Sequence, residues 1–251
     1  GINAISTQQL YDGLDYLNDV SFGKVEETLR SHWSKLAPND SSSFILDVTD
    51  TYYAGSRKKH ENPRKGKDGK ISRLIQIGLI VSFENGFPIL HRTYGGNIPG
   101  MKIFSDLLAD MAAAEINSIV MDRGFYSEEN ITEAERLGMK VIIGMKQTYQ
   151  LKKNYLSKIE RDVIYSKANQ FNLRESKVYI QEFPYLNGRL IILYNPKLEV
   201  LKRDALFAND DQEREIKYLG YSLVYHNTDL PAKTVVRKYF DKDSVERSFK
   251  S

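Results

Sequence analysis

Between residues 44 and 145 the order of the apolar segments along the chain constrains the fold. Three strand-like segments come first, because Phe44–Tyr53, Leu74–Phe83 and Pro88–Tyr94 are rich in β-branched and aromatic residues. The turn residues Asn85–Gly86 join the second of them to the third by a short connection. We therefore predict that the three segments form an antiparallel meander.

The segments that follow alternate between helical and strand-like patterns. Met101–Ala114 has helical composition and spacing, and Ser118–Met121 is a short apolar run typical of a buried strand. Ser127–Leu137 is a second predicted helix with Ser127 as its N-cap, and Val141–Gly144 is another short strand. Three antiparallel strands followed by helix, strand, helix and strand is the order of ribonuclease H-like domains. We therefore expect an α/β fold with a mixed sheet of this type.

Residues on both sides of this core have different patterns. Thr7–Leu36 carries apolar residues at helical spacing and predicts two helices that separate near Ser21–Gly23. Between Gln147 and Tyr218 the pair Asn187–Gly188 separates two strand-like segments, which predicts a hairpin, and the chain becomes helical again after Pro231. We expect three parts: a helical N-terminal segment (1–40), a ribonuclease H-like core (41–146 and 219–251) and a β-rich insertion (147–218).

Composition excludes several kinds of site. The chain has no cysteine, which excludes disulfides, zinc–thiolate sites and thiol catalysis. Its four histidines show no paired ligand spacing, so any metal would be held by carboxylates, the ligands of Mg²⁺ or Mn²⁺. No apolar run approaches the roughly 18 residues that span a bilayer, and no signal peptide opens the chain. We therefore expect a soluble, cytoplasmic protein with no membrane partner. Because the chain begins at Gly1, without methionine, and ends at Ser251 within a predicted helix, we take it to be a fragment of a longer protein.

The positive charge of the chain is concentrated in one loop. The net charge is only +3, but residues 57–73 contain eight Lys and Arg against two acids, so this loop is net +6. Glycine and proline disfavour regular structure there, and its charge suits the release of counterions from DNA phosphates. A solvated hairpin loop is the alternative interpretation. The candidate DNA-contacting residues are Arg57, Lys58, Lys59, Arg64, Lys65, Lys67, Lys70 and Arg73.

Two aspartates lie on predicted strands as candidate metal ligands. Asp47 is in the middle of the first strand, where a charge is costly unless it is solvated, paired or bound to a metal. Asp122 follows the apolar run 118–121, at the carboxyl end of a strand, where open α/β sheets place ligands. The alternatives are a strand-edge aspartate facing water for Asp47, and a turn cap or a pair with Arg123 for Asp122.

A third carboxylate, Glu246, lies on the last predicted helix. At 100° per residue, Tyr239, Lys242 and Glu246 form one stripe of that helix. Taken alone, this stripe is better explained as an amphipathic helix with an ordinary Lys–Glu pair. Phosphodiester cleavage by two metal ions, however, requires acidic residues that converge on ions about 3.5–4 Å apart. A central strand, an adjacent strand end and a packed helix can bring such residues together.

The motifs around these residues resemble those of DDE transposases of bacterial and archaeal insertion sequences, in the insertion-sequence-4 group. The likeness covers almost the whole chain. Asp47 is followed two residues later by Thr49, and the loop Gly66-Lys67-Asp68 leads to a strand that contains Gln76. The pair Gly96-Asn97 follows the third strand, as in this family.

The second half of the chain carries two further signatures of the same family. Asp122-Arg123-Gly124-Phe125 matches its Asp-Arg-Gly motif. Tyr239, Lys242 and Glu246 match the spacing of Tyr, two residues, Arg, three residues and Glu, with Lys242 in place of the arginine. Lysine cannot form the bidentate contact with phosphate that arginine forms, so we expect a contact of Lys242 with DNA to be weaker or to have a different direction.

The resemblance implies a DDE transposase, a metal-dependent polynucleotidyl transferase and endonuclease. Its catalytic and metal-binding residues would be Asp47, Asp122 and Glu246, holding two Mg²⁺ (or Mn²⁺) ions. It would cleave DNA at transposon ends and transfer the released 3′-hydroxyls into target DNA, and Lys242 and Tyr239 would contact DNA, unless Tyr239 only packs in the helix interface. The implied partners are double-stranded DNA and a second copy of the chain. The alternatives are a domesticated or decayed transposase that only binds DNA, or another ribonuclease H-like nuclease.

Overall fold

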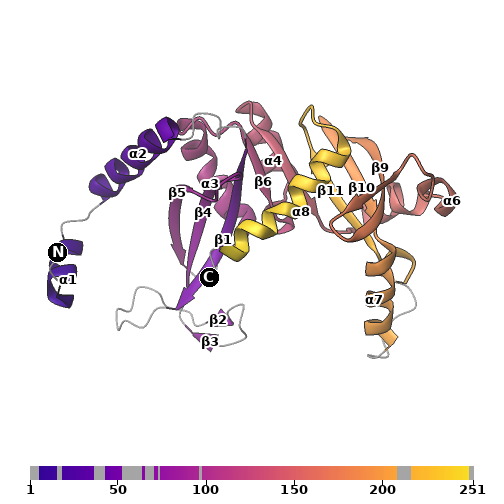
Figure 1. Ribbon diagram of the computed structural model, residues 1–251, viewed down its shortest axis with the longest axis horizontal. Coiled ribbons are helices and arrows are strands. Elements are labelled where there is room, and N and C mark those ends of the chain that lie inside the picture. The colour runs from indigo at the N-terminus through magenta and orange to yellow at the C-terminus, as the bar shows by residue number, and fades with distance from the viewer. Residues whose placement is uncertain are drawn as a thin grey trace.

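The computed structural model describes residues 6–15, 19–36, 43–52, 64–65, 71–72, 74–95, 98–207 and 216–248. Within these residues nine strands form one sheet, and two short strands, β2 (Arg64–Lys65) and β3 (Ile71–Ser72), form a separate pair (Figure 1). The strands of the large sheet are β1 (Phe44–Tyr52), β4 (Leu74–Ser82), β5 (Pro88–Gly95), β6 (Ser118–Met121), β7 (Lys140–Met145), β8 (Gln170–Leu173), β9 (Ser176–Tyr185), β10 (Gly188–Tyr194) and β11 (Tyr221–His226).

The large sheet is mixed, with the strand order β5-β4-β1-β6-β7-β11-β10-β9-β8. Strand β4 runs antiparallel to both β1 and β5. Strands β1, β6 and β7 are parallel to one another, and from β7 to β8 each strand is antiparallel to its neighbour. The expected α/β class with a mixed sheet is therefore what the structure has.

Helices lie on both faces of this sheet (Figure 1). On one face α3 and α4 pack against it, and on the other face α8 crosses it. The helices are α1 (Thr7–Asp15), α2 (Asp19–Leu36), α3 (Gly100–Ala113), α4 (Glu128–Arg136), α5 (Tyr149–Asn154), α6 (Arg161–Ile164), α7 (Pro196–Phe207) and α8 (Ala232–Ser248), with 3₁₀ turns η1 (Arg123–Phe125), η2 (Leu156–Lys158) and η3 (Ile216–Tyr218). In the described part of the chain no helix is both long and apolar enough to cross a membrane.

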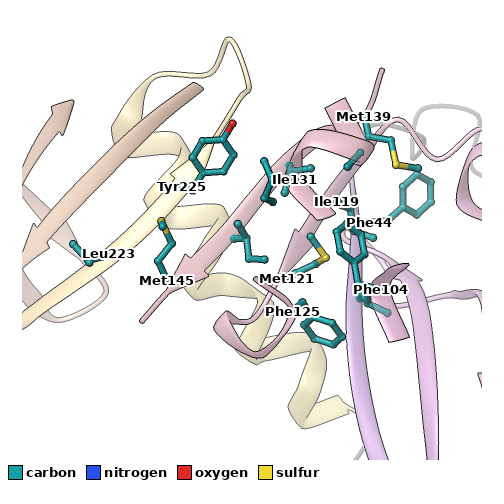
Figure 2. Packing of buried hydrophobic residues seen from close by; sticks show 14 of the residues in the cluster. Phe44, Phe104, Ile119, Met121, Phe125, Ile131, Met139, Met145, Leu223 and Tyr225 are labelled. Carbon is teal, nitrogen blue, oxygen red and sulfur yellow. The ribbon is translucent and has the colours of Figure 1, made fainter. Parts of the chain in front are cut away.

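The period-2 alternation of the central strands builds a core on each face. Ile119 and Met121 of β6 belong to the core on the side of α3 and α4, where Phe104 is also fully buried (Figure 2). Val120, between them, belongs to the core on the side of α8, together with Val235. Burying a side chain of this size stabilises the fold by about 1.5–3 kcal/mol, so both faces of β6 contribute. A strand buried on both faces explains the uninterrupted apolar run before Asp122.

Helix α4 begins where the sequence predicts. The Ser127 hydroxyl accepts a hydrogen bond from the backbone N–H of Asn130 at 3.1 Å, which is an N-cap contact. The Asn130 side chain in turn donates to the carbonyl of Met101 at 2.6 Å, which ties α4 to α3. These contacts hold the short connection between β6 and α4, the segment that begins with Asp122.

The two predicted N-terminal helices, α1 and α2, are present, but the predicted place of their separation is wrong. Helix α2 continues through Ser21–Gly23 instead of ending there. A glycine inside a helix costs only about 1 kcal/mol relative to alanine. Packing of α2 against the edge strand offsets this cost, because Trp33 stacks on Phe87 with ring centroids 4.3 Å apart and Glu26 forms an ion pair with Arg92.

The predicted hairpin is present, but its turn lies one residue earlier. Tyr185 pairs with Gly188, so the two turn residues are Leu186 and Asn187, and Leu186 adopts a φ of +50°. Gly188 is already part of β10. It is needed there because a Cβ would lie 2.3 Å from the backbone oxygen of His226. The glycine permits close approach of neighbouring backbone.

Residues 147–218 contain more than strands. Helices α5, α6 and α7 belong to this segment, and its three strands β8, β9 and β10 join the large sheet through β11. Figure 1 shows α7 projecting from the far end of the sheet. The division of the chain into three parts stays a prediction.

Candidate active site

The two candidate aspartates occupy one row across the parallel strands. Leu46 of β1 is paired with Met121 of β6, and Met121 is paired with Ile143 of β7. The next residues along these three strands are Asp47, Asp122 and Gly144. Adjacent strands are about 4.8 Å apart, so the backbones of Asp47 and Asp122 are neighbours at the same level of the sheet.

Both aspartates belong to the face that α8 crosses. Side chains alternate between the faces of a strand, so Asp47 shares its face with Ile45. Ile45 and Val120 pack in the same core as Val235 of α8. Asp122 comes two residues after Val120, so its side chain lies on the same face of the sheet as that of Val120. Both carboxylates are only partly buried, and the Asp122 side chain is 50% exposed.

Helix α8 is fixed across the sheet by contacts along its length. Near its start, the Lys233 ammonium donates to the carbonyl of Gln170 in β8 at 3.3 Å. In its middle, the Lys238 ammonium donates to the Ser43 hydroxyl, just before β1, at 2.9 Å. Arg174, in the β8–β9 turn, donates to the carbonyl of Phe240. The helix therefore crosses the sheet from the side of β11 towards β1 (Figure 1).

Tyr239 connects α8 to Asp122. Its hydroxyl donates a hydrogen bond to Oδ1 of Asp122 at 3.2 Å. Burial raises the pKa of Tyr239, and the negative charge of Asp122 raises it further, so the hydroxyl stays protonated and remains a donor. The residue predicted to contact DNA or to pack in the helix interface thus contacts a candidate metal ligand.

Gly144 makes room for this tyrosine. A Cβ at position 144 would lie 2.1 Å from the Tyr239 hydroxyl oxygen and 2.8 Å from Cζ. No side chain larger than hydrogen fits while Tyr239 keeps its place. Gly144 is not among the predicted site residues, although a glycine inside an apolar strand is a signal of close approach.

Lys242 is the second α8 residue near Asp122. It is only 6% exposed, and its ammonium lies 3.9 Å from Asp122 Oδ1 and 3.3 Å from Asp243 Oδ1. It also lies over the ring of Tyr239, 5.5 Å from the centroid. A buried ammonium requires such partners. Its position places a fixed positive charge next to the candidate metal ligand.

The structure places the other predicted site residues less completely. Glu246 is on α8, one turn after Lys242, and its side chain lies outside the described residues. Arg64 and Lys65 form β2, and their side chains are also outside the described part. The remaining basic loop residues, Arg57, Lys58, Lys59, Lys67, Lys70 and Arg73, lie outside the described residues altogether.

The sequence of the chain matches a known protein family. The family described as Transposase DDE domain matches residues 38–251, which is most of the chain. The chain belongs to this family. A solved structure of piggyBac transposase, a synaptic complex with hairpin DNA, is similar at a TM-score of 0.43 with 10% identity. The match covers 98% of this chain and 55% of that one, so the chain spans about half the length of that relative. No curated protein matches the chain.

The carboxylates of this transposase domain suit a hard divalent cation. Asp47 and Asp122 supply oxygen donors from neighbouring strands, and oxygen is what Mg²⁺ and Mn²⁺ prefer. Among the side chains that the structure describes, no group of three His, Cys, Asp or Glu gathers around one point. The Glu246 side chain lies outside the described residues, so the candidate donors that the structure places are Asp47 and Asp122.

A second ionic cluster holds the segment that leads into α8 of the transposase domain. The buried His226, at the end of β11, contacts Glu182 Oε1 through Nε2 at 2.9 Å and the Thr228 hydroxyl through Nδ1 at 3.1 Å. Arg189 donates to the other carboxylate oxygen of Glu182 at 2.6 Å. Burial would raise the pKa of Glu182, but the hydrogen bonds and charges of Arg189 and His226 outweigh it and lower the pKa.

We expect Glu182→Gln to remove an acid-sensitive part of the stability. Because the folded-state pKa of Glu182 lies below the ordinary value of 4.5, ionised Glu182 stabilises the fold above that value. This contribution is lost as the pH falls through the folded pKa. Thermal unfolding followed by circular dichroism should show a lower Tm for the variant at neutral pH and a shrinking difference in acid. Glu175→Gln, an exposed turn residue, should match the wild type; an equal Tm of Glu182→Gln and wild type at neutral pH would refute the role.

Proposed function

We propose that this transposase domain cleaves DNA at the ends of a transposable element and joins the released 3′-hydroxyl ends to target DNA. Its active site comprises Asp47, Asp122 and Glu246. The observation that carries the proposal is the row formed by the two aspartates on the face that α8 crosses. The motifs around these residues also support the finer assignment to the insertion-sequence-4 group.

The course of α8 supports the inclusion of Glu246. Lys238 is anchored at Ser43, and the helix and β1 run towards the same end of the molecule in Figure 1. From Lys238 to Glu246 the helix rises about 12 Å, at 1.5 Å per residue. From Ser43 to Asp47 the strand advances about 13 Å, at 3.3 Å per residue. The segment of α8 after this anchor point is therefore long enough for Glu246 to come near Asp47, which supports its inclusion.

The residues of the chain have separate tasks in this reaction. Asp47, Asp122 and Glu246 would hold two divalent cations, which supply activation of the attacking oxygen and stabilisation of the leaving oxygen. Tyr239 orients the Asp122 carboxylate through its hydrogen bond. Lys242 offsets negative charge beside Asp122, where the phosphate of the scissile bond adds more.

The proposed partners are double-stranded DNA and a second copy of the chain. Transposition needs two DNA ends in one complex, which a homodimer provides. The basic loop of residues 57–73 is the proposed contact with DNA phosphates, because it holds a net charge of +6.

Incubation with a plasmid that carries the DNA flanking the protein's own reading frame tests the proposal. We expect breaks at defined positions in Mg²⁺ or Mn²⁺ and none in EDTA. Asp122→Asn, purified in the same way, controls for contaminating nuclease. Binding of this DNA without any cleavage in Mg²⁺ would contradict the proposal and favour a transposase that has become a DNA-binding protein. Cleavage without preference for the flanking DNA would favour another nuclease.

Neutralising the basic loop should flatten the salt dependence of DNA binding. Each lost phosphate contact lowers the slope of log K against log salt by about 0.9. We expect the variant Arg57→Gln/Lys58→Gln/Lys59→Gln to bind more weakly at low salt and with a slope lower by about 2–3. Fluorescence anisotropy with a labelled duplex measures both. An unchanged slope would show that the loop is only solvated.

A further inference from the structure

A cleft of about 430 Å³ lies beside the candidate active site. Two of its lining residues connect it to Asp122: Arg123 follows that aspartate in the chain, and the hydroxyl of Tyr239 is hydrogen-bonded to it. The opposite walls come from the segment between β7 and β11, through Lys152 of α5 and Tyr218 of η3. The cleft thus extends from the metal-ligand row to elements that the active site does not use.

All the charged side chains that line this cleft are positive. Four cationic side chains line it: Arg123, Lys146, Lys152 and Lys202. They come from η1, the residue after β7, α5 and α7, so the chain brings them together from four separate segments. Among the described residues that line the cleft, none is an aspartate or a glutamate. Cations gathered in a concave surface without acids raise the local concentration of anions.

The wall opposite the active site is ordered by hydrogen bonds. The Gln147 side chain donates to the carbonyls of Tyr218 at 3.3 Å and Tyr221 at 2.8 Å, which ties η3 to the end of β7. The Lys152 ammonium lies over the ring of Tyr218, 5.4 Å from its centroid. Such contacts fix where the cation is before a ligand arrives, which lowers the entropic cost of binding.

We propose that this cleft binds the phosphate backbone of the duplex DNA that leads away from the scissile phosphate. The inference rests on the proposed function, because it takes the DNA at Asp122 as given. Phosphates repeat along each strand, so a strand whose scissile phosphate lies at Asp122 presents the next phosphates to groups immediately beside it. Arg123 is the first such group, and Lys146, Lys152 and Lys202 continue the path.

This surface is distinct from the basic loop of residues 57–73. That loop follows β1, whereas the cleft opens beyond β7, on the other side of β6 in the strand order. The two sets of residues have no member in common, so their phosphate contacts would add to one another. The cleft then sets the direction in which the duplex lies over the sheet. It takes no part in the cleavage reaction.

The test measures binding of a fluorescein-labelled duplex in EDTA, by anisotropy, over a series of NaCl concentrations. Without metal no cleavage occurs, so failure of the proposed catalysis does not affect the result. The cleft variant is Lys152→Gln/Lys202→Gln. The matched control is Lys153→Gln/Lys158→Gln, which removes two exposed lysines that do not line the cleft. Lys152→Arg/Lys202→Arg keeps the charges, and circular dichroism confirms that each variant is folded.

We expect the cleft variant to bind about tenfold more weakly and to lower the salt slope by about 2, one unit for each lost phosphate contact. The control and the arginine variant should keep the wild-type slope. Photo-crosslinks from bromodeoxyuridine-substituted duplex should fall on or next to residues that line the cleft, such as Lys152, Lys202 or Tyr218. Equal slopes for the cleft variant and the control would overturn the proposal, as would crosslinks confined to other parts of the chain.

Discussion

Asp122→Asn and Asp47→Asn should each lower metal-dependent DNA cleavage by more than about a hundredfold, because even groups that only support a metal ligand contribute 10–100-fold. Both substitutions keep the size of the side chain and remove the charge that a divalent cation requires. Duplex binding in EDTA should stay within about twofold of wild type, since no phosphate contact is lost. The cleavage assay with flanking DNA and an anisotropy titration measure the two effects separately.

Asp50→Asn is the matched control for this prediction. Asp50 is on the same strand as Asp47, but three residues further along and therefore on the opposite face. Its substitution should leave cleavage unchanged. Full cleavage by Asp122→Asn in Mg²⁺ would show that the row of aspartates is not the active site. Equal losses of DNA cleavage for Asp50→Asn and Asp47→Asn would contradict the prediction. They would show that the total charge of β1 matters, and not the position of Asp47 on the face that α8 crosses.

Gly144→Ala should have the second largest effect. The added Cβ would lie 2.1 Å from the Tyr239 hydroxyl oxygen, so either Tyr239 leaves Asp122 or α8 moves. Overpacking of this kind costs about 1–3 kcal/mol of stability. We expect a lower Tm together with a loss of cleavage, because Asp122 loses the group that orients it.

A double-mutant cycle separates this mechanism from a general defect. In a Tyr239→Ala background the clash is absent, so Gly144→Ala should cost far less stability than in the wild type, with a coupling energy of at least about 1 kcal/mol. Gly23→Ala is the control, since a Cβ there meets no atom within 4 Å. It should be neutral or slightly stabilising, because alanine favours a helix. Additive effects of Gly144→Ala and Tyr239→Ala would contradict the close packing.

The central strands and their succession along the chain could be predicted from the sequence because their patterns are local. Ser118–Met121 is predicted and observed with the same bounds, because polar residues on both sides of the apolar run mark where the strand begins and ends. Ser127 is predicted and observed as the N-cap of α4, because that contact depends on residues three positions apart. Periodicity and capping are short-range signals, and they suffice for these elements.

Contacts between distant segments could not be predicted in the same way. The hydrogen bond from Tyr239 to Asp122 joins residues 117 positions apart, and the need for Gly144 appears only when α8 crosses the sheet. Likewise, the register that aligns Asp47 with Asp122 depends on parallel pairing of β1 and β6. The motifs indicated which residues matter, but only the packing of α8 shows that Tyr239 and Lys242 lie next to Asp122.

Diffraction from crystals soaked in Mn²⁺, recorded for anomalous scattering, tests the central claim most directly. We expect anomalous peaks in contact with the carboxylates of Asp47 and Asp122, with Glu246 completing the site, and two such peaks about 3.5–4 Å apart when DNA is bound. The same crystals of Asp47→Asn should lose them. Strong Mn²⁺ peaks elsewhere and none between β1 and β6, or a Glu246 side chain directed away from both aspartates, would contradict the account.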